Sequence, residues 1–180
     1  DTALGLEPVC FRNMPTRRRF CALLLMALPL PPHAWALDPP AGAVVLTITG
    51  RVRSPNAGAN AVFDMAMLSK LPQHSFVTWT PWYPQPRKFS GPLLRDVLAA
   101  AGCEGTTLRA TALNDYQVEL PFDDARLHQV LVARLLDDKP MSVRDKGPLF
   151  LIYPFDSDPA LRNAVYYSRA AWQLQSLEVI

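Results

Sequence analysis

The stretch MSVRDKGPLFLIYP, Met141–Pro154, is the part of the chain from which the fold is predicted. Its second half, Leu149–Tyr153, is a continuous apolar run that ends at a proline, as expected of a strand buried on both faces. Its first half places Arg144–Lys146 directly before a Gly-Pro pair. A buried strand entered through a short charged loop holds cations and backbone N–H groups at a fixed rim, which suits an anionic or polar ligand. A solvated turn between two strands is the alternative interpretation.

Periodic patterns predict more strands on both sides of this stretch. Alternating or continuous apolar residues favour strands at Val44–Val52, Ser75–Thr80, Leu108–Ala112, Tyr116–Leu120, Val130–Leu136 and Trp172–Ile180. Asp137–Pro140 has the composition of a turn. The 18 prolines also favour frequent chain reversals over long helices.

The helices are expected to be few and short. Asp64 can cap a helix that runs to Leu71. The clearest helix is expected to open at Phe89–Pro92, with the proline in its first turn, and to end at Gly102. Its apolar face is made of Leu93, Leu94, Val97, Leu98 and Ala101. Single helical turns are expected at Asp123–His128 and from Asp158. Many short strands with few short helices predict an α+β domain of twisted mixed sheets.

Composition limits the classes of function. The chain has 180 residues and a net charge of +2, and 49% of its residues are hydrophobic. Four of the 18 basic residues and two of the 16 acidic ones lie in the first 36, so the remainder carries 14 of each. A neutral remainder offers no basic field for nucleic acid or a membrane surface. Its size suits one hydrophobic core, so we expect a single domain at 37–180.

The first 36 residues have the layout of a secretory signal. Arg17–Arg19 precede the apolar run Phe20–Leu28, and Ala34-Trp35-Ala36 offers small residues where a signal peptidase reads. We therefore expect cleavage after Ala36 and a periplasmic protein. The arginines suit either the general secretory or the twin-arginine route. The apolar run is shorter than the roughly 20 residues that span a bilayer, so stable membrane insertion is not expected.

Cysteine and histidine usage argues against a metal site built by the protein. Cys10 and Cys21 lie before the expected cleavage site, which leaves Cys103 alone after it. A single cysteine makes neither an internal disulfide nor a cysteine-rich metal site. His74 and His128 have no partner at ligand spacing. No metal-binding residues are therefore predicted, and Cys103 is expected to be an inert, partly covered thiol.

Four segments, in the same order along the chain, resemble the molybdopterin-binding domain of the sulfite oxidase family. They are FSGPLLRDVL at Phe89–Leu98, ALNDY at Ala112–Tyr116, KGPL at Lys146–Leu149 with Tyr153-Pro154, and WQL at Trp172–Leu174 with LEV at Leu177–Val179. Together they span nearly the whole of the expected mature chain. The resemblance implies the sulfite-oxidase-type fold, with its mixed sheets and few short helices.

The chain departs from that family at the metal ligand. The family's enzymes hold molybdenum through a cysteine in the loop after an early strand, and the matching stretch here, Thr78–Trp82, has no cysteine. Cys103 lies in another part of the pattern, and threonine hydroxyls replace a soft thiolate ligand poorly. The chain is more similar to small exported relatives that lack the cysteine, including PruR-type pterin-binding regulators. That resemblance implies a pterin without metal as the ligand.

The predicted binding residues combine the resemblance with the chemistry of a pterin, a flat fused ring with donors and acceptors at its edge. Such a ring needs an aromatic platform and polar groups around its rim. Trp82 is the favoured platform, Asn114 and Asp115 can pair with the pyrimidine edge, and Arg144 and Lys146 can bind a carbonyl, hydroxyl or phosphate. The full predicted set is Thr80, Trp82, Asn114, Asp115, Tyr116, Arg144, Lys146, Arg169 and Trp172.

Each of these residues has a plainer interpretation. Trp82 and Trp172 can be core residues, Asn114-Asp115 an ordinary turn, and Arg144 with Lys146 part of a solvated loop. The sequence contains no nucleophile elbow, no glycine-rich phosphate loop and no evident histidine–carboxylate pair, so no catalytic residue is predicted.

Two functions stay open at this point. The resemblance to the exported regulators implies a pterin-binding module that signals to the periplasmic part of a membrane-bound cyclic-di-GMP enzyme. The resemblance to the wider family implies a small oxidoreductase, or a subunit of one, that depends on the molybdenum cofactor.

Overall fold

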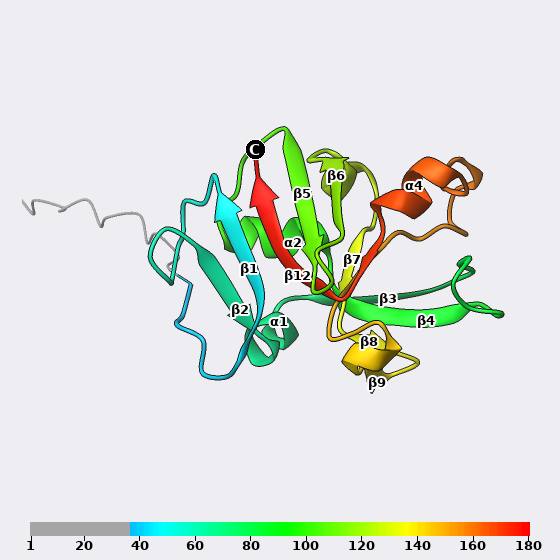
Figure 1. The fold of residues 1–180 in the computed structure, drawn as a ribbon, viewed down its shortest axis with the longest axis horizontal. Helices are drawn as coiled ribbons and strands as arrows, with labels where there is room; N and C mark the ends of the chain where they lie inside the picture. Colours follow the sequence, from blue (N-terminus) through cyan, green and yellow to red (C-terminus); the bar gives the residue numbers. More distant parts are fainter. Residues whose placement is uncertain (1–36) are drawn as a thin grey trace, which may run out of the picture. The chain divides into compact units, whose positions relative to one another are not determined.

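The structure, a computed structural model, describes residues 37–180. The predicted signal segment and its cleavage site at Ala36 lie outside the described residues. The fold is a mixed α+β arrangement of three sheets with a few short helices (Figure 1). None of the helices in the described part is long and apolar enough to cross a membrane.

The largest sheet has five strands in the order β2-β1-β12-β5-β6. Their bounds are β1 Val44–Gly50, β2 Ala61–Asp64, β5 Thr107–Ala112, β6 Gln117–Pro121 and β12 Leu174–Val179. β1 and β12 run parallel, and the other neighbours are antiparallel. The alternation predicted for β5 is confirmed, because Leu108, Ala110 and Ala112 are buried while the residues between them are half-buried.

Two smaller sheets complete the domain. One has the order β11-β10-β7, with β7 Leu131–Ala133, β10 Phe150–Ile152 and β11 Ala171–Trp172. The other has the order β3-β4-β8-β9, with β3 Gln73–Thr78, β4 Arg87–Pro92, β8 Leu135–Leu136 and β9 Lys139–Pro140. The buried strand predicted at Leu149–Tyr153 is confirmed, since each of its five residues has no exposed surface.

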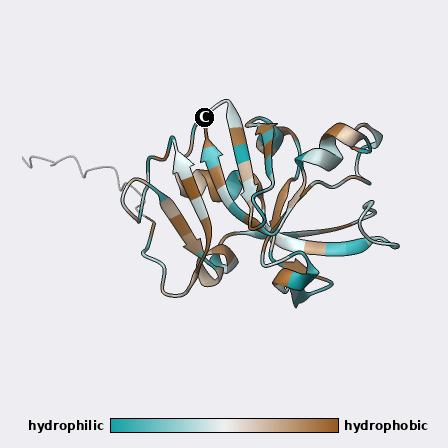
Figure 2. Ribbon diagram, viewed as in Figure 1, coloured by the Kyte–Doolittle hydropathy of each residue, from teal (hydrophilic) through white to brown (hydrophobic). Residues whose placement is uncertain are grey.

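The helices of the described part are short, and three of the four overlap predicted ones, whereas the helix at Ala164–Arg169 was not predicted. They are α1 Met65–Lys70, α2 Leu94–Ala100, α3 Asp124–Leu127 and α4 Ala164–Arg169, with 3-10 turns at Val143–Asp145 and Pro159–Leu161. Asp64 caps α1, as predicted, by accepting a hydrogen bond from the N–H of Met67 at 2.7 Å. Leu94, Val97 and Leu98 form the buried face of α2. Hydrophobic residues also concentrate on the central strands, whereas the outer part of β4 is hydrophilic (Figure 2).

One helix boundary was predicted wrongly. The segment Phe89–Pro92 belongs to strand β4, and α2 begins only after Leu93. A proline at the end of a strand needs no ladder N–H, so its position does not distinguish a strand end from a first helical turn. Gly91 allows β4 to lie against β7, because a Cβ there would come 2.3 Å from the carbonyl oxygen of Val132.

Two predicted strands are each divided between sheets. Val130–Leu136 breaks at Arg134 into β7 and β8, and the C-terminal strand breaks at Gln173, which has a φ of 55°. The predicted turn at Asp137–Pro140 is a tight hairpin between β8 and β9, with positive φ at Asp137 and Asp138. These breaks bring the ends of the three sheets together around the loop that precedes β10.

Candidate ligand-binding site

A cavity of about 310 Å³ lies beside the charged loop that precedes β10. It is lined by Tyr83, Arg87, Leu136, Lys139, Pro140, Met141, Arg144, Asp145 and Lys146. These residues come from the segment that leads into β4, from the β8–β9 hairpin and from the 3-10 turn Val143–Asp145. The cavity is therefore built where two separate parts of the chain, Tyr83–Arg87 and Leu136–Lys146, meet.

Local hydrogen bonds fix the charged loop on its side of the cavity. The Ser142 hydroxyl accepts from the N–H of Asp145 at 3.2 Å and donates to the Asp145 carboxylate at 2.8 Å. Lys146 follows in the left-handed conformation, with a φ of 71°. Its carbonyl accepts from the N–H of Gln173 at 3.0 Å, and the Gln173 side chain donates to the Val143 carbonyl at 2.8 Å. The loop is thus held to the main body of the domain from both ends.

Tyr83 provides the aromatic surface of the cavity. The guanidinium of Arg87 lies 5.0 Å from its ring centroid and the ammonium of Lys146 lies 5.2 Å from it. The Tyr83 hydroxyl is buried and has no hydrogen-bond partner among the described residues. Burial raises the pKa of Tyr83, as do Asp145 and Asp137, against the opposing effect of Arg87. A neutral phenol that lacks a partner is a free hydrogen-bond donor and acceptor for a ligand.

The charge at the cavity is predominantly positive. Arg87 is paired with Asp137 at 2.5 Å, whereas Lys139, Arg144 and Lys146 make no ion pair within residues 37–180. Asp145 is the one carboxylate in the lining. An arrangement of several cations around an aromatic ring favours a ligand that is flat and rich in acceptor atoms, or anionic.

Trp82 packs against other aromatic rings and is not part of the lining of this cavity. Its ring centroid is 5.5 Å from that of Trp172, and it also contacts Phe150, Phe155 and Tyr167 at 5.6 to 6.3 Å. Both tryptophans are half-buried. The two predicted aromatic residues are therefore brought together, in a cluster whose other members are largely buried.

Thr80 precedes these aromatic residues and is fully buried. Its hydroxyl has no partner among the described residues, and its carbonyl accepts a long hydrogen bond, 3.5 Å, from the N–H of Tyr83. Buried hydroxyls without a partner are uncommon, because desolvation costs free energy. Thr80 and Tyr83 thus place two such groups within one short segment.

The predicted turn at Asn114–Tyr116 is connected to the cavity only through the backbone. The N–H of Leu113 donates to the carbonyl of Gln173, the residue that also holds Lys146. The Asn114 side chain accepts from the N–H of Tyr116 at 3.3 Å, and Asp115 has a φ of 62°. All three residues of the turn are exposed. The ordinary turn interpretation accounts for these contacts, and the cavity lining does not include the three residues.

Arg169 is engaged in a structural ion pair. Its guanidinium donates to the Asp124 carboxylate at 2.8 Å, and the Tyr153 hydroxyl donates to the same oxygen at 2.8 Å. Asp124 is 4% exposed, and burial followed by Asp124 raises the pKa of Tyr153. Arg169 therefore has a structural role in this ion pair, and its role in binding a ligand stays a prediction.

Two other cavities lack this combination of groups. One of about 420 Å³ is lined by Gly50–Arg53 and Glu104–Thr106, where Arg53 and Glu104 already pair at 2.6 Å. One of about 550 Å³ is lined mainly by aliphatic and small side chains near Leu71 and Ala99. Neither has an aromatic ring beside cations, so the Tyr83 cavity is the stronger candidate.

Comparison with known proteins gives no family. No protein-family model matches this chain, and no curated protein matches it either. The candidate site must therefore be judged on its own geometry.

Only two of the nine lining residues, Arg144 and Lys146, were predicted, and the missed ones include the aromatic Tyr83 and the cations Arg87 and Lys139. Tyr83 adjoins the predicted platform Trp82, so its aromatic character was a usable signal. The two cations gave none, because they come to the cavity through the pairing of β4 with β8 and of β8 with β9.

Cys103 does not fit the role of a molybdenum ligand. It lies just after α2 and is 7% exposed, and it borders a small cavity between α2 and α3. Burial raises the pKa of its thiol to about 11, which makes it a poor nucleophile at neutral pH. The expectation of an inert, covered thiol agrees with this burial. A group of three or more histidine, cysteine, aspartate or glutamate side chains at metal-binding distance is absent from the described residues.

Proposed function

We propose that this protein binds a pterin without molybdenum in the Tyr83 cavity. The observation that carries the proposal is the aromatic ring of Tyr83 with two cationic side chains near it and with a buried hydroxyl that has no partner among the described residues. A pterin presents a flat π-face to such a ring and donors and acceptors to such a rim. The cavity volume of about 310 Å³ lies within the usual range for small-molecule sites.

The resemblance to the sulfite oxidase family supports the class of ligand. The segments that carry it include Lys146–Leu149, and Lys146 lies at the cavity rim. The same resemblance is the basis for proposing the sulfite-oxidase-type fold and signalling to a membrane-bound cyclic-di-GMP enzyme. The layout of the first 36 residues is the basis for proposing export to the periplasm. Within this proposal the pterin is a signal that is bound, and no reaction is assigned to the chain.

A binding titration with a reduced pterin tests the proposal. Tyr83→Ala removes an aromatic contact of about 0.5–1.5 kcal/mol together with apolar burial, so the affinity should fall about 10- to 100-fold. Tyr83→Phe keeps the ring and removes the hydroxyl, so it should bind more weakly than the wild type by about 0.5–1.5 kcal/mol but more tightly than Tyr83→Ala. Lys146→Ala and Arg144→Ala should weaken binding by smaller factors, because exposed cations are screened by water and salt.

Arg51→Ala is the matched control, since Arg51 is an exposed arginine outside the cavity. Its affinity for the pterin should equal that of the wild type. Wild-type affinity in Tyr83→Ala, with an unchanged melting temperature, would rule out the proposed site. Metal analysis of protein purified after native export distinguishes the pterin-binding module from the oxidoreductase alternative. Only the oxidoreductase should contain stoichiometric molybdenum.

A further inference from the structure

Within the described part of the chain, strand β3 is paired along one edge only. Within its sheet it is hydrogen-bonded only to β4, in the order β3-β4-β8-β9. The pairing with β4 covers all six residues of Gln73–Thr78 without a register shift. The structure therefore presents a regular strand whose second side is available to another strand.

The direction of the backbone groups along this edge follows from the pairing of β4. The carbonyls of Lys88 and Ser90 accept hydrogen bonds from the N–H groups of Asp137 and Arg134. The backbone polar groups of these two β4 residues therefore point toward β8. Residues alternate along a strand, so Phe89 and Gly91 face β3. Their partners in β3 are Phe76 and His74, so the backbone N–H and C=O groups of Ser75 and Val77 point away from β4. Among residues 37–180, neither N–H donates to a loop or turn carbonyl, and β4 is the only strand paired with β3.

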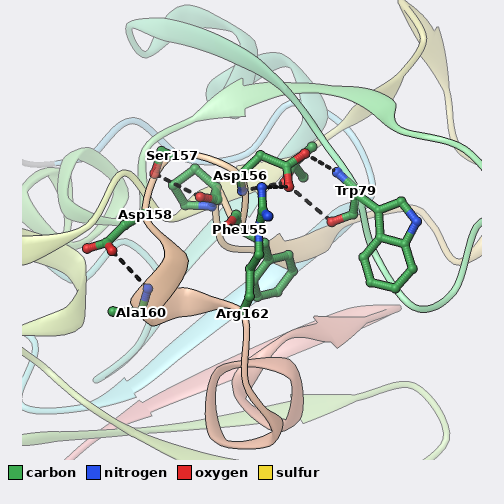
Figure 3. A network of polar contacts seen from close by, with 9 residues as sticks. Trp79, Phe155, Asp156, Ser157, Asp158, Ala160 and Arg162 are labelled. Carbon is green, nitrogen blue, oxygen red and sulfur yellow. Dashed lines mark hydrogen bonds and ion pairs between the residues drawn. The ribbon is translucent and has the colours of Figure 1, made fainter.

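The backbone N–H of Trp79, the next residue that points outward, already has a hydrogen-bond partner. Its N–H donates to the Asp156 carboxylate at 2.7 Å, and Arg162 donates to the same carboxylate at 2.7 Å (Figure 3). The N–H of Asp156 in turn donates to the Thr78 hydroxyl at 3.0 Å. An inward-pointing carboxylate is a common way to block a sheet edge. Here it blocks the end of the edge and leaves Ser75–Val77 open.

The open part of the edge has no other protection. Gln73–Thr78 contains no proline, lysine, arginine, aspartate or glutamate. Val77 and Trp79 are 60% and 43% exposed, and they project from the same face as Ser75. A strand edge without charges, with exposed apolar side chains beside it, is complementary to a second edge of the same kind.

We propose that β3 pairs with β3 of a second copy of this chain, as antiparallel strands about a two-fold axis. With the axis at Phe76, Ser75 of each copy lies opposite Val77 of the other. The outward N–H and C=O groups of both residues then satisfy one another in about four hydrogen bonds. The Asp156 block limits the ladder to this length, so the association is that of a small interface. This pairing is independent of the ligand proposed above.

Sedimentation velocity of the purified protein over roughly 1–500 µM tests the pairing, a range suited to a weak interface. The wild type should shift from monomer to dimer as the concentration rises. Ser75→Pro removes an outward N–H that the β3–β4 ladder does not use, and a proline is tolerated on such an edge. It should weaken dimerisation at least tenfold while the melting temperature changes little. Val77→Lys places a charge at the same edge and should act likewise.

Val165→Lys is the matched control, because Val165 is another exposed valine, 55% accessible, on helix α4. It should dimerise as the wild type does. A monomeric wild type over the whole range would overturn the proposal. Dimerisation at wild-type strength in both Ser75→Pro and Val77→Lys would overturn it as well, since the interface would then lie elsewhere.

Discussion

Trp82 and Tyr83 are adjacent in the chain but have different surroundings. Trp82 contacts Trp172 and three further aromatic rings, whereas Tyr83 contacts one aromatic ring, Phe89, and has Arg87 and Lys146 near its own ring. The first environment rewards apolar area and edge-to-face geometry, and the second rewards a ring face that attracts cations. At the scale of single residues, these contacts give Trp82 a packing role, and Tyr83 is the residue for which we propose ligand contact.

Replacing Trp82 by alanine should reduce stability more than a substitution at an exposed position of a proline-rich loop would. A buried tryptophan costs about 3–5 kcal/mol when replaced by alanine, and Trp82 is half-buried, so we expect about 2 kcal/mol. For a domain of this size, that lowers the melting temperature by about 4–8 °C. Thermal unfolding of Trp82→Ala measures it, with Trp79→Ala as the control, because Trp79 is 43% exposed. An equal, small loss in both variants would contradict the packing role.

At the scale of elements, α3 and α4 are held together by polar side chains. Arg169 near the end of α4 and Tyr153 after β10 both donate to Asp124 of α3, and Arg169 also lies 5.0 Å from the ring of Tyr166. Helices of one or two turns have little stability of their own. The buried Asp124 carboxylate links these short elements and so stabilises them. Removing either of its partners would leave a buried charge with too few donors and would destabilise the fold.

Arg169→Ala should therefore act on stability. It leaves the Asp124 carboxylate with one donor in a buried position, and we expect a loss of about 2–3 kcal/mol. Arg126→Ala is the control, because Arg126 forms only an exposed pair with Asp123 at 3.8 Å and should cost less than about 1 kcal/mol. Urea unfolding measures both free energies. If Arg169→Ala weakened pterin binding without loss of stability, the structural role would be contradicted and contact between Arg169 and the ligand would be supported.

At the scale of the whole domain, Asp64 ties the first described residues to the largest sheet. Its carboxylate accepts from the N–H groups of Met67, Gly42 and Ala41, and it is 2% exposed. The hydrogen bond from Met67, followed by that from Gly42, lowers the pKa of Asp64 below its ordinary value. Protonation of this one group therefore affects the attachment of an entire segment.

The lowered pKa gives stability a definite dependence on pH. Because the folded state holds the ionised form, the contribution of Asp64 is complete above its unfolded pKa of about 3.9 and is lost as pH falls through the lower folded value. Asp64→Asn should thus be less stable at pH 7 and lose less of its remaining stability between about pH 5 and pH 3. Urea unfolding at several pH values measures this. The same acid dependence in Asp64→Asn and the wild type would contradict it.

Local patterns in the sequence were sufficient for several elements of the fold. The continuous apolar run at Leu149–Tyr153, the cap at Asp64 and the alternation at Leu108–Ala112 each specify burial or an end within one short segment. These features depend on side-chain period and on backbone hydrogen bonds between near neighbours. The α+β class and the charged loop at Arg144–Lys146 followed from the same kind of information.

The roles of single residues depended on contacts between distant segments. The sequence places Trp82 and Tyr83 side by side, and only the packing of β10 and β11 against one and of Lys146 against the other separates them. Likewise, Arg169 is occupied by a carboxylate 45 residues away. The pattern of one segment determines which face is buried, but a charged or aromatic side chain takes its function from the partner that the tertiary structure brings to it.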